Sequence, residues 1–333
     1  MRPEPRPRSI LVLRLSALGD VIHTLPAVNS LRAGWGEGVP IGWVCERPYV
    51  DLIQTVAPVD EVFEVDTRRW RSSPASRDTR REISFVVRRL REFSDCGWAI
   101  DFQGLLKSSI FGWLSSAERR YGFDRGNVRE VAAMPFSNHR VAVAGEHVID
   151  RNLELARAAG GVEVETPFLG LARLSADPRD AIVSLVSEPP IVILPGAGQE
   201  RKQWPPDSWI HLLETIRERV AVPVLVVWGP GEKELAEGIA HRGGGVVAPE
   251  TDLRDLGALL LGARLVVGGD TGPLHLAEAM GVPVVALHGP TDPRRNGPWR
   301  QQGSVATPSD RGTNMSTIDT ALVVDLVMAA LGV

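Results

Sequence analysis

The chain contains very few cysteines and lysines. Its 333 residues include two cysteines, Cys45 and Cys96, which lie far apart in the sequence and show no metal-ligand spacing. This excludes a disulfide framework and favours a reducing, cytoplasmic compartment. Three of the 37 basic residues are lysines, Lys107, Lys202 and Lys233. A lysine kept in so arginine-rich a chain suggests a need for a compact point charge, although three cases are also compatible with chance.

Long apolar runs and several catalytic motifs are also missing. No run of 18 apolar residues occurs, so no membrane-spanning helix is expected. Neither G-x-x-x-x-G-K-[ST] nor Asp-x-Asp is present, so neither a P-loop enzyme nor a carboxylate pair that holds a metal-bound diphosphate is indicated. Zinc-ligand and Ser-His-Asp spacings are absent as well. The net charge of −4 gives no electrostatic reason to expect nucleic acid as a partner.

The chain does have a repeated alternation of short apolar runs and helical stripes. This rhythm stops in a segment without clear periodicity, at about 170–190, and then starts again. The pattern predicts an α/β fold of two Rossmann-like, doubly wound domains, 1–175 and 176–333, facing across a ligand-binding cleft. The closing helix, residues 318–331, is a candidate to pack back on the first domain.

Residues 268–293, GGDTGPLHLAEAMGVPVVALHGPTDP, predict a strand–turn–helix–strand unit. The helix begins where the strand ends, so free N–H groups and the positive end of the helix dipole would form an anion site. Four residues are candidates to hold a diphosphate there: Asp270, Thr271, Gly272 and His275. Asp270 is expected to order the turn rather than to contact the anion. A well-capped helix without a ligand, and a satisfied core histidine at position 275, are the alternatives.

A second strand–turn–helix lies at the front of the chain. Residues 10–13 form an apolar run, and a helical stripe follows over 21–31. Asp20, in the turn, is either a general base or the N-cap of that helix. His23 could share its face and support it.

Residues 68–91 contain nine arginines and two acidic residues. Over 83–93 the apolar positions fall on one helical face, so these arginines would face solvent. Arg68, Arg69 and Arg71 lie in a polar stretch, 67–81, that is expected to form a flexible loop able to capture an anionic ligand. A simple solvated surface is the alternative.

Five motifs together resemble the glycosyltransferases that move a heptose from ADP-heptose onto the inner core of lipopolysaccharide. The motifs span nearly the whole chain: LRLSALGDVIHTLPA (13–27), DFQGLLKS (101–108), LPGAGQERKQWP (194–205), VVWGPGEKE (226–234) and the 268–293 segment. The resemblance implies the GT-B architecture, inversion at the sugar carbon, and no metal or cofactor. It also implies ADP-heptose as donor and a lipid-linked anionic saccharide acceptor at the inner face of the cytoplasmic membrane. The motifs at 13–27 and 101–108 look most like the first heptosyltransferase, which acts on Kdo. We expect a monomer.

The resemblance also suggests roles for individual residues. Asp20 matches the general base, and Lys202 matches a lysine that neutralises the departing diphosphate. Residues expected to bind the nucleotide sugar are Gly196, Gly198, Trp228, Gly229, Glu232, Asp270, Thr271, Gly272 and His275. Glu234 competes with Glu232 for the ribose, because the turn is one residue shorter than the family pattern. Residues expected to bind the acceptor are Ser16, Gly19, Arg68, Arg69, Gln103, Gly104 and Lys107.

Other functions stay open at this point. Residues 196–201 start like a dinucleotide fingerprint but have arginine in place of the third glycine, which weakens a dehydrogenase. A glycosyltransferase using another nucleotide sugar, a sugar-nucleotide epimerase and a non-catalytic nucleotide-binding protein are the remaining alternatives.

Overall fold

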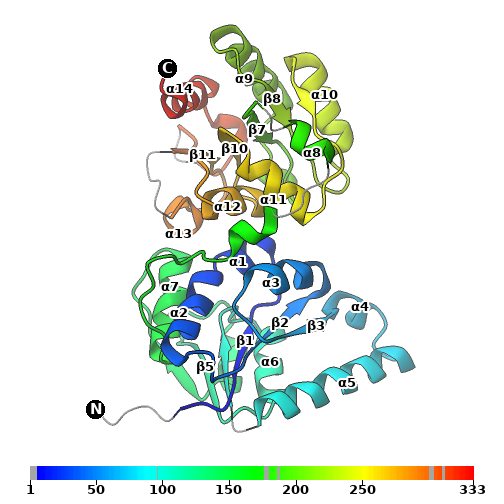
Figure 1. The fold of residues 1–333 in the computed structure, drawn as a ribbon, viewed down its shortest axis with the longest axis vertical. Helices are drawn as coiled ribbons and strands as arrows, with labels where there is room; N and C mark the ends of the chain where they lie inside the picture. The colour runs from blue at the N-terminus through cyan, green and yellow to red at the C-terminus, as the bar shows by residue number, and fades with distance from the viewer. Residues whose placement is uncertain (1–5, 96, 176–179, 186–187, 300–303, 310–311) are drawn as a thin grey trace. The chain divides into compact units, whose positions relative to one another are not determined.

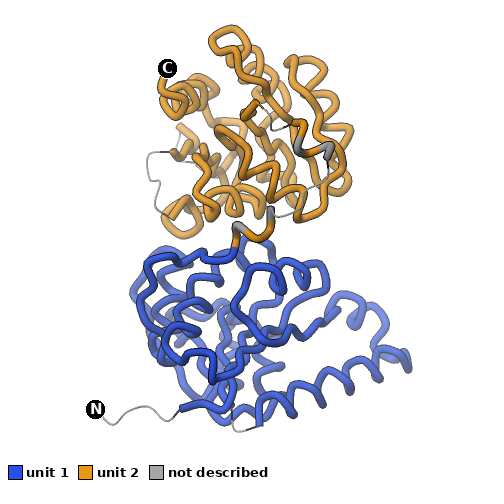
Figure 2. The backbone as a smooth tube through the Cα atoms, viewed as in Figure 1, with its two compact units in different colours: residues 1–170 blue, residues 171–333 orange. Residues whose placement is uncertain are grey.

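The computed structural model of the chain consists of two compact units that divide between Gly170 and Leu171 (Figure 2). It describes residues 6–95, 97–175, 180–185, 188–299, 304–309 and 312–333. Cys96 and position 176, the expected start of the second domain, lie outside these ranges. Within the described ranges, no helix combines the length and the apolar character needed to cross a membrane.

The first unit is built on a parallel sheet with the order β3-β2-β1-β4-β5-β6 (Figure 1). Its strands are β1 (Ile10–Leu13), β2 (Ile41–Glu46), β3 (Glu61–Val65), β4 (Trp98–Asp101), β5 (Arg119–Phe123) and β6 (His139–Val141). Strand β1 is central, and its Ile10 is aligned with Ile41 of β2 and Trp98 of β4. The chain order reverses between β1 and β4, and open α/β sheets bind ligands at the carboxyl ends of strands at such a point.

Helices cover both faces of this sheet. The segments are α1 (Leu18–Ile22), α2 (Leu25–Trp35), η1 (Arg47–Tyr49), α3 (Val50–Val56), α4 (Thr67–Ser72), α5 (Arg77–Ser94), α6 (Leu106–Leu114), η2 (Val131–Phe136) and α7 (Val148–Ala158). Leu90 of α5 and Phe111 of α6 pack on alternate strand residues such as Leu11 and Leu13. Helix α2 packs against α7 (Figure 1). Because both faces are covered, β1 is a continuous buried apolar run.

The second unit repeats the same strand order, β12-β11-β10-β7-β8-β9, when counted from β7. Its strands are β7 (Ile191–Leu194), β8 (Val224–Val226), β9 (Val246–Val247), β10 (Leu265–Gly269), β11 (Val284–Leu287) and β12 (Val305–Ala306). Its helical segments are η3 (Leu171–Ser175), α8 (Asp180–Leu185), η4 (Glu200–Lys202), α9 (Pro206–Arg219), α10 (Lys233–Gly243), α11 (Leu253–Leu261), α12 (Gly272–Ala279), α13 (Pro293–Asn296), η5 (Met315–Thr317) and α14 (Thr320–Leu331). The closing helix, α14, packs on α9 and on β10, β11 and β12 of its own unit.

The predicted fold class, α/β with two Rossmann-like doubly wound domains, is confirmed. Two local expectations are wrong. The stripe over 21–31 is not one helix, because Pro26 cannot donate to the Ile22 carbonyl, and the chain breaks there into α1 and α2. Residues 67–72 form helix α4 rather than a loop, because Asp66 caps its N-terminus by accepting from the Arg69 N–H.

Candidate active site

The expected diphosphate-binding residues lie where β10 ends and α12 begins. Thr271 is the N-cap of α12, and Gly272 is the first residue of the helix. A helix N-terminus has N–H groups without intrahelical partners and the positive end of the helix dipole. The Thr271 hydroxyl is buried and has no hydrogen-bond partner among the described residues. This turn can hold an anion through its backbone N–H groups.

Asp270 joins two cationic or potentially cationic side chains at this helix end. Its Oδ2 lies 2.8 Å from Lys202 Nζ, and its Oδ1 lies 2.8 Å from His275 Nε2. Lys202 Nζ also donates to the Asp270 carbonyl at 3.3 Å. Burial by itself raises the pKa of Asp270, but the hydrogen bonds and charges of His275 and Lys202 outweigh it and lower the pKa. The carboxylate therefore stays ionised and holds Lys202 beside the free backbone N–H groups at the start of α12.

The expected nucleoside residues form a corner at the ends of β7 and β8. Glu232 Oε2 accepts from the Gly229 N–H at 2.9 Å. A Cβ on Gly196 would lie 1.9 Å from the same oxygen, so only glycine leaves room for this carboxylate. Glu234, its competitor in the sequence, is exposed in the first turn of α10. The geometry favours Glu232 as the acidic residue of this corner.

Two further members of the set have different surroundings. The Trp228 indole N–H donates to the Ala248 carbonyl at 2.8 Å, so its polar atom is already used. Its ring lies 5.8 Å from Lys233 Nζ and offers an aromatic surface at the end of β8. A Cβ on Gly198 would meet nothing within 4 Å, so close packing does not explain glycine there.

Asp20, the candidate general base, lies inside α1 in the first unit. The N-cap of α1 is Ala17, so the alternative that Asp20 caps the helix is wrong. Its Oδ2 accepts from Arg129 Nη1 at 3.2 Å, and its Oδ1 lies 3.7 Å from Arg14 Nη1. About a quarter of the side chain is exposed (27%), whereas Arg14 is buried. The carboxylate is thus held by two guanidinium groups and still reaches solvent.

His23 does not share the exposed face of Asp20. Its side chain is buried, and its ring packs edge-on against His147 with the centroids 5.7 Å apart. A supporting role for His23 stays a prediction. Thr24 does contact Asp20, because its hydroxyl donates to the Asp20 carbonyl at 2.8 Å and accepts from Arg14 Nε at 3.0 Å.

The expected acceptor residues divide into two groups. Lys107 Nζ donates to the Ser16 hydroxyl at 3.0 Å and lies 4.0 Å from Glu46 Oε1, so these side chains meet at the carboxyl ends of β1, β2 and β4. Gln103 is buried, and its Oε1 accepts from the Leu15 N–H at 2.7 Å, which joins the ends of β4 and β1. Gly104 has a φ of +65°, which only glycine adopts easily.

Arg68 and Arg69 lie on α4. Arg69 pairs with Asp66 and Glu82, and these hydrogen bonds raise the pKa of Arg69 and lower the pKa of Glu82. Its charge is therefore already compensated in the fold. Arg68 is exposed. The structure does not bring Arg69 into the group formed by Ser16 and Lys107.

Sequence reasoning missed three charged residues of these sites. Arg14 had a signal, since it follows directly after the apolar residues of β1. Glu46 ends β2 and accepts from the Thr67 N–H at 3.1 Å, and a charge at a strand end was a weak signal too. Arg129 had none, because it reaches Asp20 from 109 residues away along the chain. In the described ranges, no group of three or more His, Cys, Asp or Glu side chains is placed to hold a metal ion.

The chain matches a known family over most of its length. The family model for glycosyltransferase family 9 (heptosyltransferase) matches residues 86–316. Lipopolysaccharide heptosyltransferase 1 of Pseudomonas aeruginosa is 33% identical over 304 residues, which cover 87% of this chain and 81% of that protein. Lipopolysaccharide heptosyltransferase 1 of Salmonella typhimurium is 29% identical over 315 residues, which cover 92% of this chain and 96% of the relative.

Solved structures agree with this match. The E. coli heptosyltransferase WaaC with ADP has a TM-score of 0.82 at 25% identity, and the match covers 97% of this chain and 99% of that one. WaaC with ADP-2-deoxy-2-fluoro heptose gives 0.79 at 25% identity, covering 96% and 99%. The predicted resemblance is confirmed, and it sets the dehydrogenase aside. The chain belongs to glycosyltransferase family 9, the heptosyltransferases.

Proposed function

We propose that this glycosyltransferase moves a heptose from ADP-heptose to a hydroxyl of a Kdo or heptose sugar in the inner core of lipopolysaccharide. Relatives named lipopolysaccharide heptosyltransferase 1 and WaaC structures with ADP and a fluorinated ADP-heptose support this assignment. The observation that carries it is the Lys202–Asp270–His275 network at the N-terminus of α12. This network places a fixed cation beside backbone N–H groups, as a diphosphate leaving group requires.

The proposed reaction is a single in-line displacement with inversion. The acceptor hydroxyl attacks the anomeric carbon, Asp20 takes its proton, and the bond to the β-phosphate oxygen breaks as ADP leaves with the electron pair. Positive charge at the leaving group comes from Lys202 and the N-terminus of α12. Because these groups stabilise the developing charge, the proposed mechanism uses neither a metal ion nor a cofactor.

The acceptor would be bound by residues of the first unit. Lys107 and Ser16 supply a cation and a hydroxyl, Gly19 lies at the start of α1, and Gly104 lies in the turn after β4. The acceptor carries lipid chains, so we place the reaction at the inner face of the cytoplasmic membrane, with the protein acting as a monomer. Exposed arginines on α4 and α5, which are attracted to anionic lipid, support this placement.

The test uses the purified full chain with ADP-heptose, with and without a Kdo-bearing lipid acceptor. We expect ADP release only when both are present, and mass spectrometry should find one added heptose on the acceptor. ADP-glucose and UDP-glucose serve as alternative donors. Faster turnover with either of them, or a product that is only an isomerised nucleotide sugar, would contradict the assignment.

A further inference from the structure

His288 lies one strand away from the turn at Thr271 and Gly272, the proposed diphosphate seat. Asp270, His288 and Thr307 are the residues that directly follow aligned positions of β10, β11 and β12, because Gly269 pairs with Leu287 and Leu287 with Ala306. The His288 N–H donates to the Ala306 carbonyl at 2.9 Å, which holds this row together. Neighbouring strands are about 4.8 Å apart, so the three residues stand side by side on one edge of the sheet.

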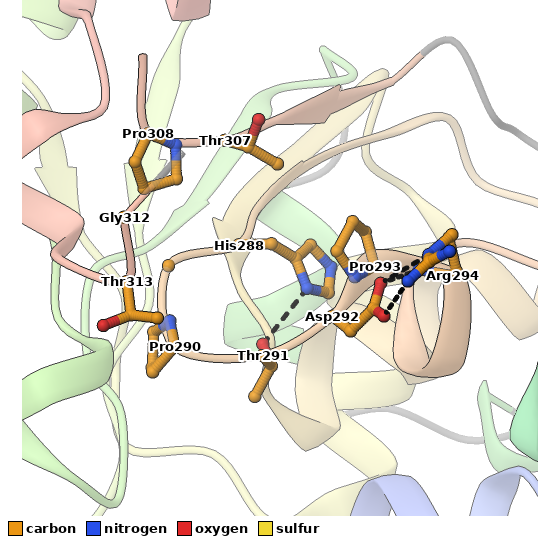
Figure 3. Close-up of a pocket in the computed structure, with 11 residues that line it drawn as sticks. His288, Pro290, Thr291, Asp292, Pro293, Arg294, Thr307, Pro308, Gly312 and Thr313 are labelled. Atoms are coloured by element: carbon orange, nitrogen blue, oxygen red, sulfur yellow. Dashed lines mark hydrogen bonds and ion pairs between the residues drawn. The ribbon is translucent and has the colours of Figure 1, made fainter. Parts of the chain in front are cut away.

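A cavity of about 590 Å³ opens at this end of the row, within the usual size of small-molecule sites. Residues 288–294 line it on one side, and residues 307–308 and 312–313 line it on the other (Figure 3). Nothing in the proposed reaction uses this cavity so far. It belongs entirely to the second unit.

The lining has no net charge. Asp292 Oδ2 lies 2.8 Å from Arg294 Nη2, and Asp292 also caps α13, so the two charges compensate each other (Figure 3). Hydrogen bonds from Arg294 lower the pKa of Asp292, which keeps the pair ionised. The rest of the wall consists of three prolines, three threonines, two glycines and one histidine: Pro290, Pro293, Pro308, Thr291, Thr307, Thr313, Gly289, Gly312 and His288. Apolar rings beside hydroxyl groups suit an uncharged, polyhydroxylated ring better than an anion.

His288 has an unused polar atom in this wall. The side chain is 1% exposed, and its Nδ1 lies 3.2 Å from the Thr291 hydroxyl. Its Nε2 is buried and has no hydrogen-bond partner among the described residues. Burial lowers the pKa of His288 to about 4, so the ring is neutral near pH 7. A neutral imidazole has one donor and one acceptor nitrogen, which matches the two roles of a sugar hydroxyl.

The order of strands gives the direction in which the donor extends. Along the edge, the strands follow the sequence β8, β7, β10, β11, β12. The corner formed by Gly196, Gly229 and Glu232 is at β7 and β8, and the proposed diphosphate seat is at β10. A nucleotide sugar that lies along this edge therefore carries its sugar past Asp270 toward β11.

We propose that the cavity beside His288 holds the sugar ring of the donor, with His288 and Thr291 bonding its hydroxyls. This inference rests on the proposed function and adds residues that select the sugar. The proline rings pack against the C–H face of the sugar, and the ring nitrogen without a partner receives one from a hydroxyl. The nucleotide and the diphosphate make no contact with this cavity.

The test compares ADP with ADP-heptose by calorimetric titration of the full chain. We expect His288→Gln and Thr291→Val each to raise the Kd for ADP-heptose about tenfold while leaving the Kd for ADP within about twofold. The matched controls on helices of the same unit are His241→Gln, at an exposed position, and Thr215→Val, at a half-buried one. Thermal unfolding of every variant identifies any that fails to fold, and having two independent substitutions keeps the comparison decisive.

Three results would overturn the inference. An equal loss of affinity for ADP and for ADP-heptose would show that the cavity supports nucleotide binding or folding rather than sugar binding. Unchanged affinities for both ligands would show that the cavity does not bind the donor. A raised KM for the acceptor with unchanged donor affinity would assign the cavity to the acceptor. A wild-type chain that binds ADP-heptose and transfers its sugar keeps the proposed function intact in all three cases. A wild-type chain that binds neither nucleotide removes the proposed function and this inference with it.

Discussion

At the scale of single residues, the candidate site depends on carboxylates that are held by basic side chains. Asp20 lies between Arg14 and Arg129, and Asp270 lies between Lys202 and His275. The two differ in exposure, since the Asp270 side chain is 6% exposed and that of Asp20 is 27% exposed. The exposed one can meet an acceptor hydroxyl, whereas the buried one can only position its neighbours.

Replacing Asp20 should therefore affect turnover more than binding. We expect Asp20→Asn to lower kcat by about 10²–10⁴-fold, the usual contribution of a general base, while the Kd for ADP stays unchanged. Initial rates and titration calorimetry measure the two quantities. Asp51→Asn, at an exposed position of α3, is the matched control. A variant with near-normal kcat would remove Asp20 from the role of base.

Two buried groups predict separate pH dependences of stability. Burial lowers the pKa of His288 from 6.5 to about 4, so the unfolded chain takes up a proton there before the folded chain does. Stability should thus fall as the pH drops from about 6.5 to about 4, by up to about 3 kcal/mol. The lowered pKa of Asp270 acts below that range, since its contribution is present above pH 4 and is lost at more acidic pH.

Urea unfolding at several pH values measures the loss of stability in both pH ranges. His288→Gln should remove the loss between about pH 6.5 and 4 and keep the loss at lower pH. His211→Gln, an exposed histidine on α9, should behave as the wild type. If the stability of His288→Gln and of the wild type changes with pH in the same way, the loss between about pH 6.5 and 4 does not come from His288.

At the scale of elements, the turns after β7 and β8 are tied together by one carboxylate. Gly196 leaves space for Glu232, whose Oε2 also holds the Gly229 N–H. Gly196, after β7, therefore makes room for a side chain from another turn. The sequence motifs at 194–205 and 226–234 contained these residues, but nothing in either motif showed that they meet.

Gly196→Ala should consequently displace Glu232. The added Cβ would lie 1.9 Å from Oε2, so we expect a loss of about 1–3 kcal/mol in unfolding free energy and at least tenfold weaker ADP binding. Adding Glu232→Ala to Gly196→Ala should recover most of the stability, because the clash disappears. Gly238→Ala in α10, where a Cβ meets nothing within 4 Å, is the control. If the losses of unfolding free energy from the two substitutions simply add in the double variant, the predicted clash between positions 196 and 232 is contradicted.

At the scale of the whole molecule, two units with the same strand order divide the predicted tasks. The residues expected to bind the donor lie in the second unit, and those expected to bind the acceptor lie in the first. The first unit also has long helix α5, whose arginines at 77, 80, 81 and 88 are exposed, as is Phe85 (51%). Basic residues around an exposed aromatic ring favour contact with an anionic lipid surface.

Replacing exposed arginines of this surface should impair use of the lipid acceptor. We expect Arg77→Ser, Arg80→Ser and Arg81→Ser together to raise the KM for a lipid-linked acceptor at least tenfold, at about 1 kcal/mol per arginine. The KM for a deacylated acceptor and the affinity for ADP should not change. Arg219→Ser, exposed at the end of α9, is the control. Equal kinetics of the triple variant with both acceptors would refute the role of this surface.

The sequence by itself determined the α/β alternation, the paired glycine turns, the family and the strand ends at which ligands are expected. These depend on residues close together in the chain, so periodicity and motifs express them directly. Only the tertiary structure decided which side chains meet. The Gln103 side chain accepts from the Leu15 N–H, Lys202 pairs with Asp270, and His288 lies one strand away from the proposed diphosphate seat. Such pairs depend on which strands become neighbours, which no local pattern of residues encodes.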